Sequence, residues 1–222
     1  MEQYTFQIVL LSDATFGRGD GMAGVVDQEV EHDSHGFPYL HGRTLKGLLS
    51  EACDSLTAAL PAPGRWTAAL QRLFGSAGSS PTTAGVWTFG DAVLPDDLRA
   101  VVAAQQHEAR AGGPSSLTPA MVLDSLTTIR QQTAIDTRSG TPEEGSLRAA
   151  RVVRRELTFA SRLTAPSAES DDLALLAAGA LALRQLGSGR SRGRGRVRCD
   201  LVNGQGETIT REGLLSFERA IR

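Results

Sequence analysis

The sequence predicts an α+β fold, because strand-like and helix-like segments alternate along a single chain of 222 residues. Three observations support this prediction: an alternating apolar strand near the N-terminus, helical segments with apolar residues at helical spacing, and a polar stretch between two strand–helix–strand halves. Split βαβ units in this order build ferredoxin-like sheets, and a βαβ-β-αβ sheet also frames the RNA-recognition motif. We therefore expect a ferredoxin-like or RNA-recognition-motif core with an inserted β-hairpin and helical insertions.

The first half begins with a strand from Tyr4 to Leu11, in which Phe6, Ile8 and Leu10 lie on one side. A helix is expected from Thr44 to Leu60, where apolar residues recur every three or four positions and form a face that packs on a core. The remaining expectations in this half are a helix from Trp66 to Phe74, a strand from Val86 to Ala92, and core positions for Trp66 and Trp87.

The middle of the chain is the least regular part, and we expect it to be an insertion. A helix fits residues 97–110, whereas residues 127–151 carry many polar groups and few apolar anchors, which is typical of an extended hairpin or a protruding arm. We assign residues 1–222 to a single domain, with a core of about 1–94 and 152–222 and an inserted arm of about 95–151.

The second half again has the order strand, helix, strand. A long strand pattern runs from Val152 to Leu163, and an apolar helix is expected from Asp171 to Leu186. A glycine-rich loop then leads into a strand from Val197 to Val202 and a terminal helix from Arg211 to Ala220.

The glycine-rich loop between Gly187 and Arg198 is the most informative motif. Six arginines lie between Arg184 and Arg198, and no acidic residue lies between Asp172 and Asp200. Glycines let a ligand approach backbone N–H groups closely, and arginines present forked, permanently charged donors that match phosphates. A Gly/Arg run can also be a flexible, solvated tail. Its place between a helix and a strand favours an ordered phosphate cradle.

The composition excludes several classes of protein. Apolar residues make up 41% and charged residues 22% of the chain, as in ordinary globular proteins, and no run of about 18 apolar residues is available to span a membrane. Cys53 and Cys199 are too few and too far apart for a disulfide framework or a zinc site. With no secretion signal at the N-terminus, we expect a cytoplasmic protein. The net charge of −2 argues against a positive potential over the whole surface but allows RNA binding at a local basic site.

Four segments occur in order along most of the chain. They are Gly24-Val25-Val26-Asp27 with Gly42 and Leu45-Lys46-Gly47; Leu73-Phe74-Gly75 with Phe89-Gly90-Asp91; Ala134-Ile135-Asp136 with Arg151-Val152-Val153; and Gly187-Ser188-Gly189-Arg190-Ser191-Arg192-Gly193. Together they resemble the RAMP superfamily of CRISPR proteins, and more narrowly the repeating backbone subunit of type III effector complexes. Where that family usually has Pro-Gly-Ser-Ser before Leu-Lys-Gly, this chain has His41-Gly42-Arg43-Thr44.

The resemblance implies a modified RNA-recognition fold whose copies stack into a filament along a CRISPR guide RNA. The implied partners are the guide RNA, a complementary target RNA, further copies of the chain and other effector subunits, with no membrane. In the family, an inserted hairpin called the thumb wedges between guide and target at regular intervals and displaces one target base. Asp27 matches the family aspartate that cleaves the target beside the displaced nucleotide.

Asp27 is therefore the candidate catalytic residue, although most loop aspartates are plain surface carboxylates. RNA cleavage can use the substrate's own 2′-hydroxyl as nucleophile, so the protein must align that hydroxyl with the phosphorus and manage protons and charge. One carboxylate can accept a proton or hold a divalent ion, so Mg²⁺ or Mn²⁺ bound by Asp27 is the expected cofactor. Asp20 and Asp33 are nearby rivals, of which Asp33 better suits the turn before Gly36.

The expected RNA contacts fall into three groups. The N-terminus of the first helix offers free N–H groups to a phosphate, and its candidates are His41, Gly42, Arg43, Thr44 and Lys46. The glycine loop contributes Gly187, Gly189, Arg190, Ser191, Arg192, Gly193 and Arg194. In the thumb, Ala134 and Ile135 are candidates for the wedge between bases, unless Ile135 is buried in a local hairpin core. The arginines expected to follow the RNA or simply be exposed are Arg130, Arg138, Arg148 and Arg151.

Three other functions stay open at this point. The chain fits a non-catalytic structural subunit of the same complex, or a CRISPR RNA processing endoribonuclease that uses His35 or His41 as acid or base. A generic RNA-binding module is the third. His32, His35 and His41 lie close together, but their spacing matches no familiar zinc pattern.

Overall fold

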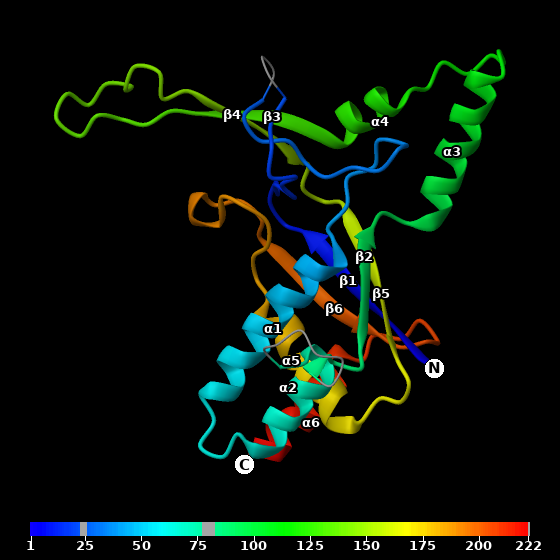
Figure 1. Cartoon of the computed structure of the whole chain (residues 1–222), viewed down its shortest axis with the longest axis vertical. Coiled ribbons are helices and arrows are strands. Elements are labelled where there is room, and N and C mark those ends of the chain that lie inside the picture. Colours follow the sequence, from blue (N-terminus) through cyan, green and yellow to red (C-terminus); the bar gives the residue numbers. More distant parts are fainter. Residues whose placement is uncertain (23–25, 77–82, 222) are drawn as a thin grey trace.

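Four antiparallel strands form the central sheet of the computed structural model, which describes residues 1–22, 26–76 and 83–221 (Figure 1). The strands are β1 (Glu2–Leu10), β2 (Thr88–Val93), β5 (Thr158–Ala165) and β6 (Val197–Val202). Their order across the sheet is β2-β5-β1-β6, so the first and last of these strands become neighbours. In β1, Phe6 lies opposite Ser161 of β5 on one side and Leu201 of β6 on the other.

The alternation of β1 is confirmed, because Phe6, Ile8 and Leu10 are each at most 1% exposed. Their side chains join one continuous core with residues of β5, β6 and the helices. Trp66 and Trp87 are also buried, as expected. A half-buried strand of this kind buries every second side chain, which fixes its register against its neighbours.

Four helices pack around this core: α1 (Gly42–Ala58), α2 (Gly64–Phe74), α5 (Ser170–Ala182) and α6 (Thr210–Ile221). α5 contacts α1, α2, α6 and β6, and all its residues from Ala174 to Ala180 are buried. A helix that is apolar on every side is expected at the centre of such a cluster. Within the described ranges, no helix combines the length and apolar character needed to cross a membrane.

The prediction that α5 continues to Leu186 is wrong. The helix ends at Ala182, and Leu183 already has extended backbone angles. Gln185 then pairs with Arg196 in an antiparallel bridge just before β6. The apolar spacing does not reveal this change, because Leu183 and Leu186 remain buried although they lie beyond the helix.

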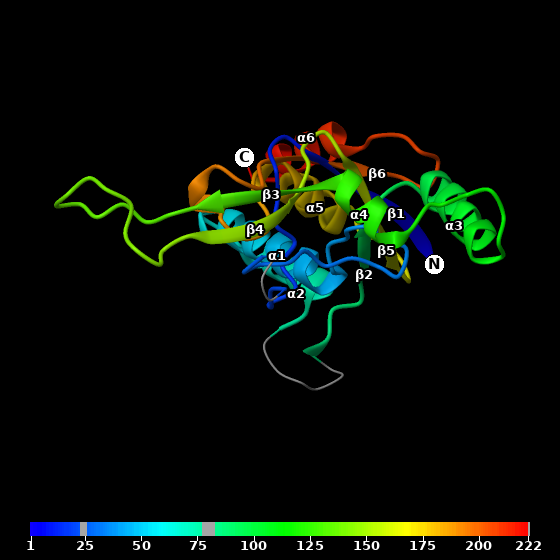
Figure 2. The same cartoon turned by 90° about the horizontal axis from the view of Figure 1, so that it is seen from above.

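The insertion between β2 and β5 contains α3 (Asp96–Arg110), α4 (Pro119–Leu126), β3 (Thr127–Gln132) and β4 (Arg148–Val153). β3 and β4 form a two-stranded antiparallel sheet, so the hairpin expected in residues 127–151 is present. Figures 1 and 2 show the stretch between these strands extending away from the core on the side opposite to α3. α4 was not expected; Thr118 caps it by accepting the Met121 N–H, and Pro119 occupies its first turn.

The single strand expected from Val152 to Leu163 is also wrong. The chain turns at residues 154–157, where Glu156 has a φ of 72°. The Glu156 N–H donates to Leu10 O, and the Leu10 N–H donates to Leu157 O. β4 and β5 therefore belong to two different sheets. The charged residues Arg154, Arg155 and Glu156 interrupt the apolar pattern at this turn, and the apolar positions resume at Leu157.

Candidate nucleic-acid interface

The glycine loop (residues 187–196) is held against the segment that follows β1. The Ser188 N–H donates to Thr15 O at 3.0 Å, and the Gly195 N–H donates to Asp13 O at 2.8 Å. Gly187 has a φ of 78°, and a Cβ there would lie 2.5 Å from Thr15 O. Glycine is therefore required by both backbone conformation and close packing at this position. The loop is anchored at both ends, unlike a free tail.

The tip of the glycine loop lies beside β3 of the hairpin, in both Figure 1 and Figure 2, where the loop is orange. It forms a 3₁₀ turn at Arg190–Arg192. Arg192 Nη1 donates to Gln132 Oε1 of β3 at 2.6 Å. Arg190 lines a different hollow. Different residues of the loop thus line different pockets.

We call the first hollow, of about 740 Å³, the arginine pocket. It lies between β3, the turn after β4 and the glycine loop, and five arginines face two acids in its lining. Of those acids, Asp13 already accepts a hydrogen bond from Arg130 Nη2 at 2.7 Å and from the Arg155 N–H at 3.1 Å. The lining arginines are Arg130, Arg154, Arg155, Arg192 and Arg194.

Arg194 is the most unusual residue of the arginine pocket. It is only 9% exposed, and its side chain forms no hydrogen bond or ion pair with any residue in the described part of the chain. Burial lowers the pKa of its guanidinium, and the nearby charges of Arg192 and Arg130 lower it further. A buried cation beside like charges is stabilised by an anion, and a phosphate matches the forked guanidinium donors.

The second hollow, of about 460 Å³, is the Asp27 pocket. It gathers residues from the first and the fourth of the sequence segments, and its lining contains four carboxylates. Three of these are engaged: Asp20 by Arg18 at 3.1 Å, Glu29 by Arg151 at 3.0 Å and Glu31 by the Tyr39 hydroxyl at 3.1 Å. Other residues lining it include Asp27, His41, Thr44, Gly187 and Arg190.

Asp27 itself is exposed and lies against β4 at the root of the hairpin. Its N–H donates to Ala149 O at 2.8 Å, and its Oδ2 accepts the Ala149 N–H at 2.7 Å. Its Oδ1 accepts no hydrogen bond from any residue that the structure describes. One oxygen thus orients the carboxylate of a residue that lines the pocket, while the other has no hydrogen-bond partner among the described residues. Gly24 and Val25, from the same sequence segment, lie outside the described residues.

The N-terminus of α1 is less open to a phosphate than its sequence indicates. The Gly42 N–H already donates to Asp91 Oδ1 at 2.7 Å, and Gly42 packs on the backbone of β2. His41 lies 3.7 Å from both Asp91 and Glu31. Lys46 Nζ lies 5.9 Å from the centroid of the Phe89 ring. The residues of this group that the structure leaves exposed are Arg43 and Thr44.

The thumb candidates divide according to exposure. Ile135 is 54% exposed, so it is not buried in a hairpin core, and Ala134 and Arg138 are exposed beside it. Arg130 is fixed near the root of the hairpin by Asp13. The expectation that Arg151 is exposed is wrong, because its guanidinium is buried among acceptors from three segments.

A metal site built by this chain alone is not present in the described ranges, which contain no group of three or more His, Cys, Asp and Glu residues suited to a metal ion. His32 Nδ1 contacts Asp33 O at 3.2 Å, and His35 Nδ1 contacts Gln106 Oε1 at 2.8 Å. His35 therefore connects its loop to α3, whereas His32 contacts a neighbouring residue of the same loop. A divalent ion at Asp27 would need most of its ligands from RNA and water.

Sequence reasoning missed several residues of the two pockets. Arg154 and Arg155 line the arginine pocket, and their adjacent positive charges were a visible signal beside the predicted arm. Ala149 and Gln132 carried no such signal, since an alanine backbone and a single glutamine amide are chemically ordinary. Their contacts with Asp27 and Arg192 depend entirely on the fold.

These two pockets, one rich in arginine and one rich in carboxylates, adjoin the glycine loop of an α+β fold. A family model described as the RAMP superfamily matches residues 7–198, so the chain belongs to the RAMP superfamily. Two similar solved structures are chains of a Type III-B Cmr-beta complex, each with a TM-score of 0.62. The apo-state chain is 16% identical, with 91% of this chain and 98% of that chain covered. The chain from the complex bound to cognate target RNA is 14% identical, with 96% and 98% covered. A sequence search of curated proteins finds no significant match.

Proposed function

We propose that this protein is a backbone subunit of a type III CRISPR effector complex. Membership of the RAMP superfamily and the likeness to chains of Type III-B Cmr-beta support this assignment. The strand order β2-β5-β1-β6, with helices between β1 and β2 and between β5 and β6, also suits a ferredoxin-like or RNA-recognition-motif core. Copies of the chain would stack along one guide RNA, together with other effector subunits.

The guide RNA would be held at the arginine pocket and the glycine loop. The observation that carries this proposal is Arg194, which is 9% exposed, lies beside Arg192 and Arg130, and forms no ion pair or hydrogen bond with a described residue. Phosphate contacts of this kind position a nucleic acid without reading its sequence. Sequence specificity would then come from base pairing between guide and target. Arg43, Arg190 and Ser191 would extend the same surface.

Target cleavage would occur at Asp27. The substrate's 2′-oxygen attacks the adjacent phosphorus while Asp27 Oδ1 accepts its proton, and the bond to the 5′-oxygen breaks. The products would be a 2′,3′-cyclic phosphate and a 5′-hydroxyl that takes a proton from water. Mg²⁺ or Mn²⁺ held by Asp27 and RNA phosphates would offset the negative charge that develops. The hydrogen bond from Ala149 to Oδ2 supports this role, because it holds the carboxylate in place while Oδ1 has no partner among the described residues.

The β3–β4 hairpin would act as the thumb that displaces a target base. Asp27 lies at its root, and the exposed Ile135 with Ala134 lies in the stretch that extends from the core (Figure 1). An apolar side chain can replace a stacked base. Arg138 lies three residues after Ile135 and would contact the RNA backbone beside it. A displaced nucleotide gains the freedom that in-line attack by its 2′-hydroxyl requires.

The decisive experiment replaces Asp27 with alanine in the assembled complex. We expect target cleavage to fall roughly a thousandfold, the middle of the range of about 10² to 10⁴ that is typical for a positioned acid–base group. Guide RNA binding and assembly should be unchanged, because the arginine pocket is not altered. Asp20→Ala is the matched control, since Asp20 lines the same pocket but is paired with Arg18. Continued cutting by an assembled Asp27→Ala complex contradicts the assignment.

A non-catalytic structural subunit is the second candidate. The observation that favours it is that the described residues form no metal-binding group around Asp27. It predicts that Asp27→Ala complexes assemble normally and that the unaltered complex does not cut target RNA either. The processing endoribonuclease is less favoured, because His35 is held by Gln106 and His41 lies between two carboxylates.

A further inference from the structure

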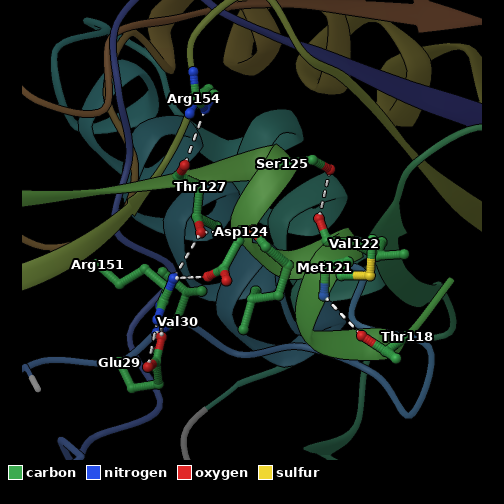
Figure 3. Close-up of polar contacts among 11 residues, drawn as sticks. Glu29, Val30, Thr118, Met121, Val122, Asp124, Ser125, Thr127, Arg151 and Arg154 are labelled. Atoms are coloured by element: carbon green, nitrogen blue, oxygen red, sulfur yellow. Dashed lines mark hydrogen bonds and ion pairs between the residues drawn. The ribbon is translucent and has the colours of Figure 1, made fainter. Parts of the chain in front are cut away.

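Arg151 is at the centre of a buried polar network at the root of the hairpin (Figure 3). Its Nε lies 3.0 Å from Glu29 Oε1 and 3.2 Å from Oε2. Its Nη1 lies 2.8 Å from Asp124 Oδ1 and 3.1 Å from Thr127 Oγ1. These partners come from the segment after Asp27, from α4 and from β3. A single side chain of β4 therefore joins the segment after Asp27 to the junction of α4 and β3, about 95 residues later in the sequence.

Two of the stretches that Arg151 connects, its own strand β4 and the segment that contains Glu29, also hold Asp27. Residues 27–29 run parallel to residues 149–151, with Gln28 and Ala150 paired in a parallel bridge. The Arg151 N–H donates to Gln28 O at 2.9 Å, and the Asp27 N–H donates to Ala149 O at 2.8 Å. Side chains alternate in extended chains, so positions two apart share a side. The ladder thus has an exposed rung, Asp27 with Ala149, and a buried rung, Glu29 with Arg151.

The buried rung is the stronger of the two. A bridge of only three residues is weak by itself, because isolated two-stranded pairings are marginal in water. A buried ion pair with additional hydrogen bonds is costly to break, since it leaves a charge without a partner. Slipping by one residue would turn Asp27 to the opposite side of the ladder. The Glu29–Arg151 pair therefore determines which way the Asp27 carboxylate faces.

We propose that Arg151 is a positioning residue that fixes the register in which the segment containing Asp27 pairs with β4. This inference rests on the proposed role of Asp27, and it adds the residue that orients the carboxylate. Asp124 and Thr127 extend the arrangement to α4 and the first residue of β3. The hairpin and the Asp27 carboxylate are consequently held in one unit, so a target held by the hairpin meets Asp27 in a set position.

The test compares Arg151→Met with Arg72→Met in the full chain. Arg72 is the matched control, because it pairs with the buried Asp172 at 2.9 Å between α2 and α5 and has no contact with the Asp27 ladder. Amide hydrogen exchange is measured on the free protein over residues 26–30 and 147–151. We expect exchange of the Asp27 and Ala149 amides to rise at least about tenfold in Arg151→Met, because their mutual hydrogen bonds open. In Arg72→Met these amides should be unchanged.

The assembled complex supplies the second measurement. In Arg151→Met, kcat for target cleavage should fall at least about tenfold with KM for target unchanged, because alignment is lost and RNA contacts are not. Glu29→Gln/Arg151→Met removes the stranded charge, so it should regain thermal stability without regaining kcat. Full recovery of kcat in this double variant would overturn a positioning role, and so would unchanged exchange at Asp27 and Ala149. A cutting Asp27→Ala complex would overturn the catalytic role of Asp27 while leaving the exchange result valid, so the two failures are distinguishable.

Discussion

The two pockets beside the glycine loop differ in the sign of their charge. The arginine pocket has five arginines and two acids, whereas the Asp27 pocket has four carboxylates and few cations. The arginine pocket is formed with the hairpin strand β3, and the Asp27 pocket with the loops before α1. One loop thus separates a surface that attracts phosphates from one that repels them.

This difference indicates that binding and cleavage have separate physical requirements. Affinity for an RNA backbone comes from guanidinium groups, which need no further component. A phosphate that enters the acidic side must overcome repulsion from Asp27 and Glu31 unless a cation neutralises it. A change in one pocket should therefore leave the function of the other intact.

The largest effect is expected from chelation of divalent ions in the assembled complex. Excess EDTA should reduce target cleavage about a thousandfold, because several kcal/mol of charge neutralisation is lost at the Asp27 pocket. Binding of labelled guide RNA, measured in parallel, should be unaffected, because the arginine pocket uses no metal. Full cleavage in the chelator would show that the carboxylates operate without a cation and would remove this distinction between the pockets.

The next effect is expected from Arg192→Ala/Arg194→Ala. Two charge-assisted phosphate contacts are lost, so guide RNA affinity should fall roughly a hundredfold in a filter-binding assay. The slope of log affinity against log salt should become shallower by about 1.4, since each phosphate contact to a single strand contributes about 0.7. Arg211→Ala/Arg219→Ala removes the same charge from α6 and serves as control. Equal losses in both variants would mean that net charge, not the pocket, governs binding.

The smallest effect concerns the stability of the glycine loop. Gly187→Ala should lower the free energy of unfolding by about 3 kcal/mol, because a Cβ at a φ of 78° also meets Thr15 O at 2.5 Å. Gly193→Ala should cost only about 1 kcal/mol, since its φ is 76° but no atom lies within 4 Å. Urea denaturation of the free chain measures both. Equal losses of unfolding free energy in the two variants would indicate that backbone strain alone explains the requirement for glycine at position 187, without the close contact to Thr15 O.

The elements that periodicity predicts well are those with one buried face. β1, α1 and β6 alternate or repeat in the sequence as they do in the structure, because burial of one side imposes the pattern. The expected α5 was too long and the expected strand at residues 152–163 was two strands. In both places, apolar residues resume after a short polar interruption, and the backbone changes direction at that interruption.

The candidate site was predictable where the residue types themselves carry the chemistry. Glycines and arginines at residues 187–194 indicate a loop suited to phosphate, and the structure forms a pocket there. Arg151 could not be interpreted in the same way, because an arginine in a polar stretch looks exposed. It is buried because Glu29, 122 residues earlier, folds back along β4.

The sequence by itself determined the α+β class, the glycine loop and the RAMP resemblance, because these depend on local periodicity and on residue types in a fixed order. Only the tertiary structure decided that the glycine loop lines one pocket rich in arginine and another rich in carboxylates. It also decided that Asp27 lies against β4 at the root of the hairpin. It also placed Asp91 at the N-terminus of α1, where the sequence indicated free donors. The physical reason is that charge complementarity and hydrogen-bond pairing act between residues that are close in space, and their separation along the chain carries no signal of that closeness.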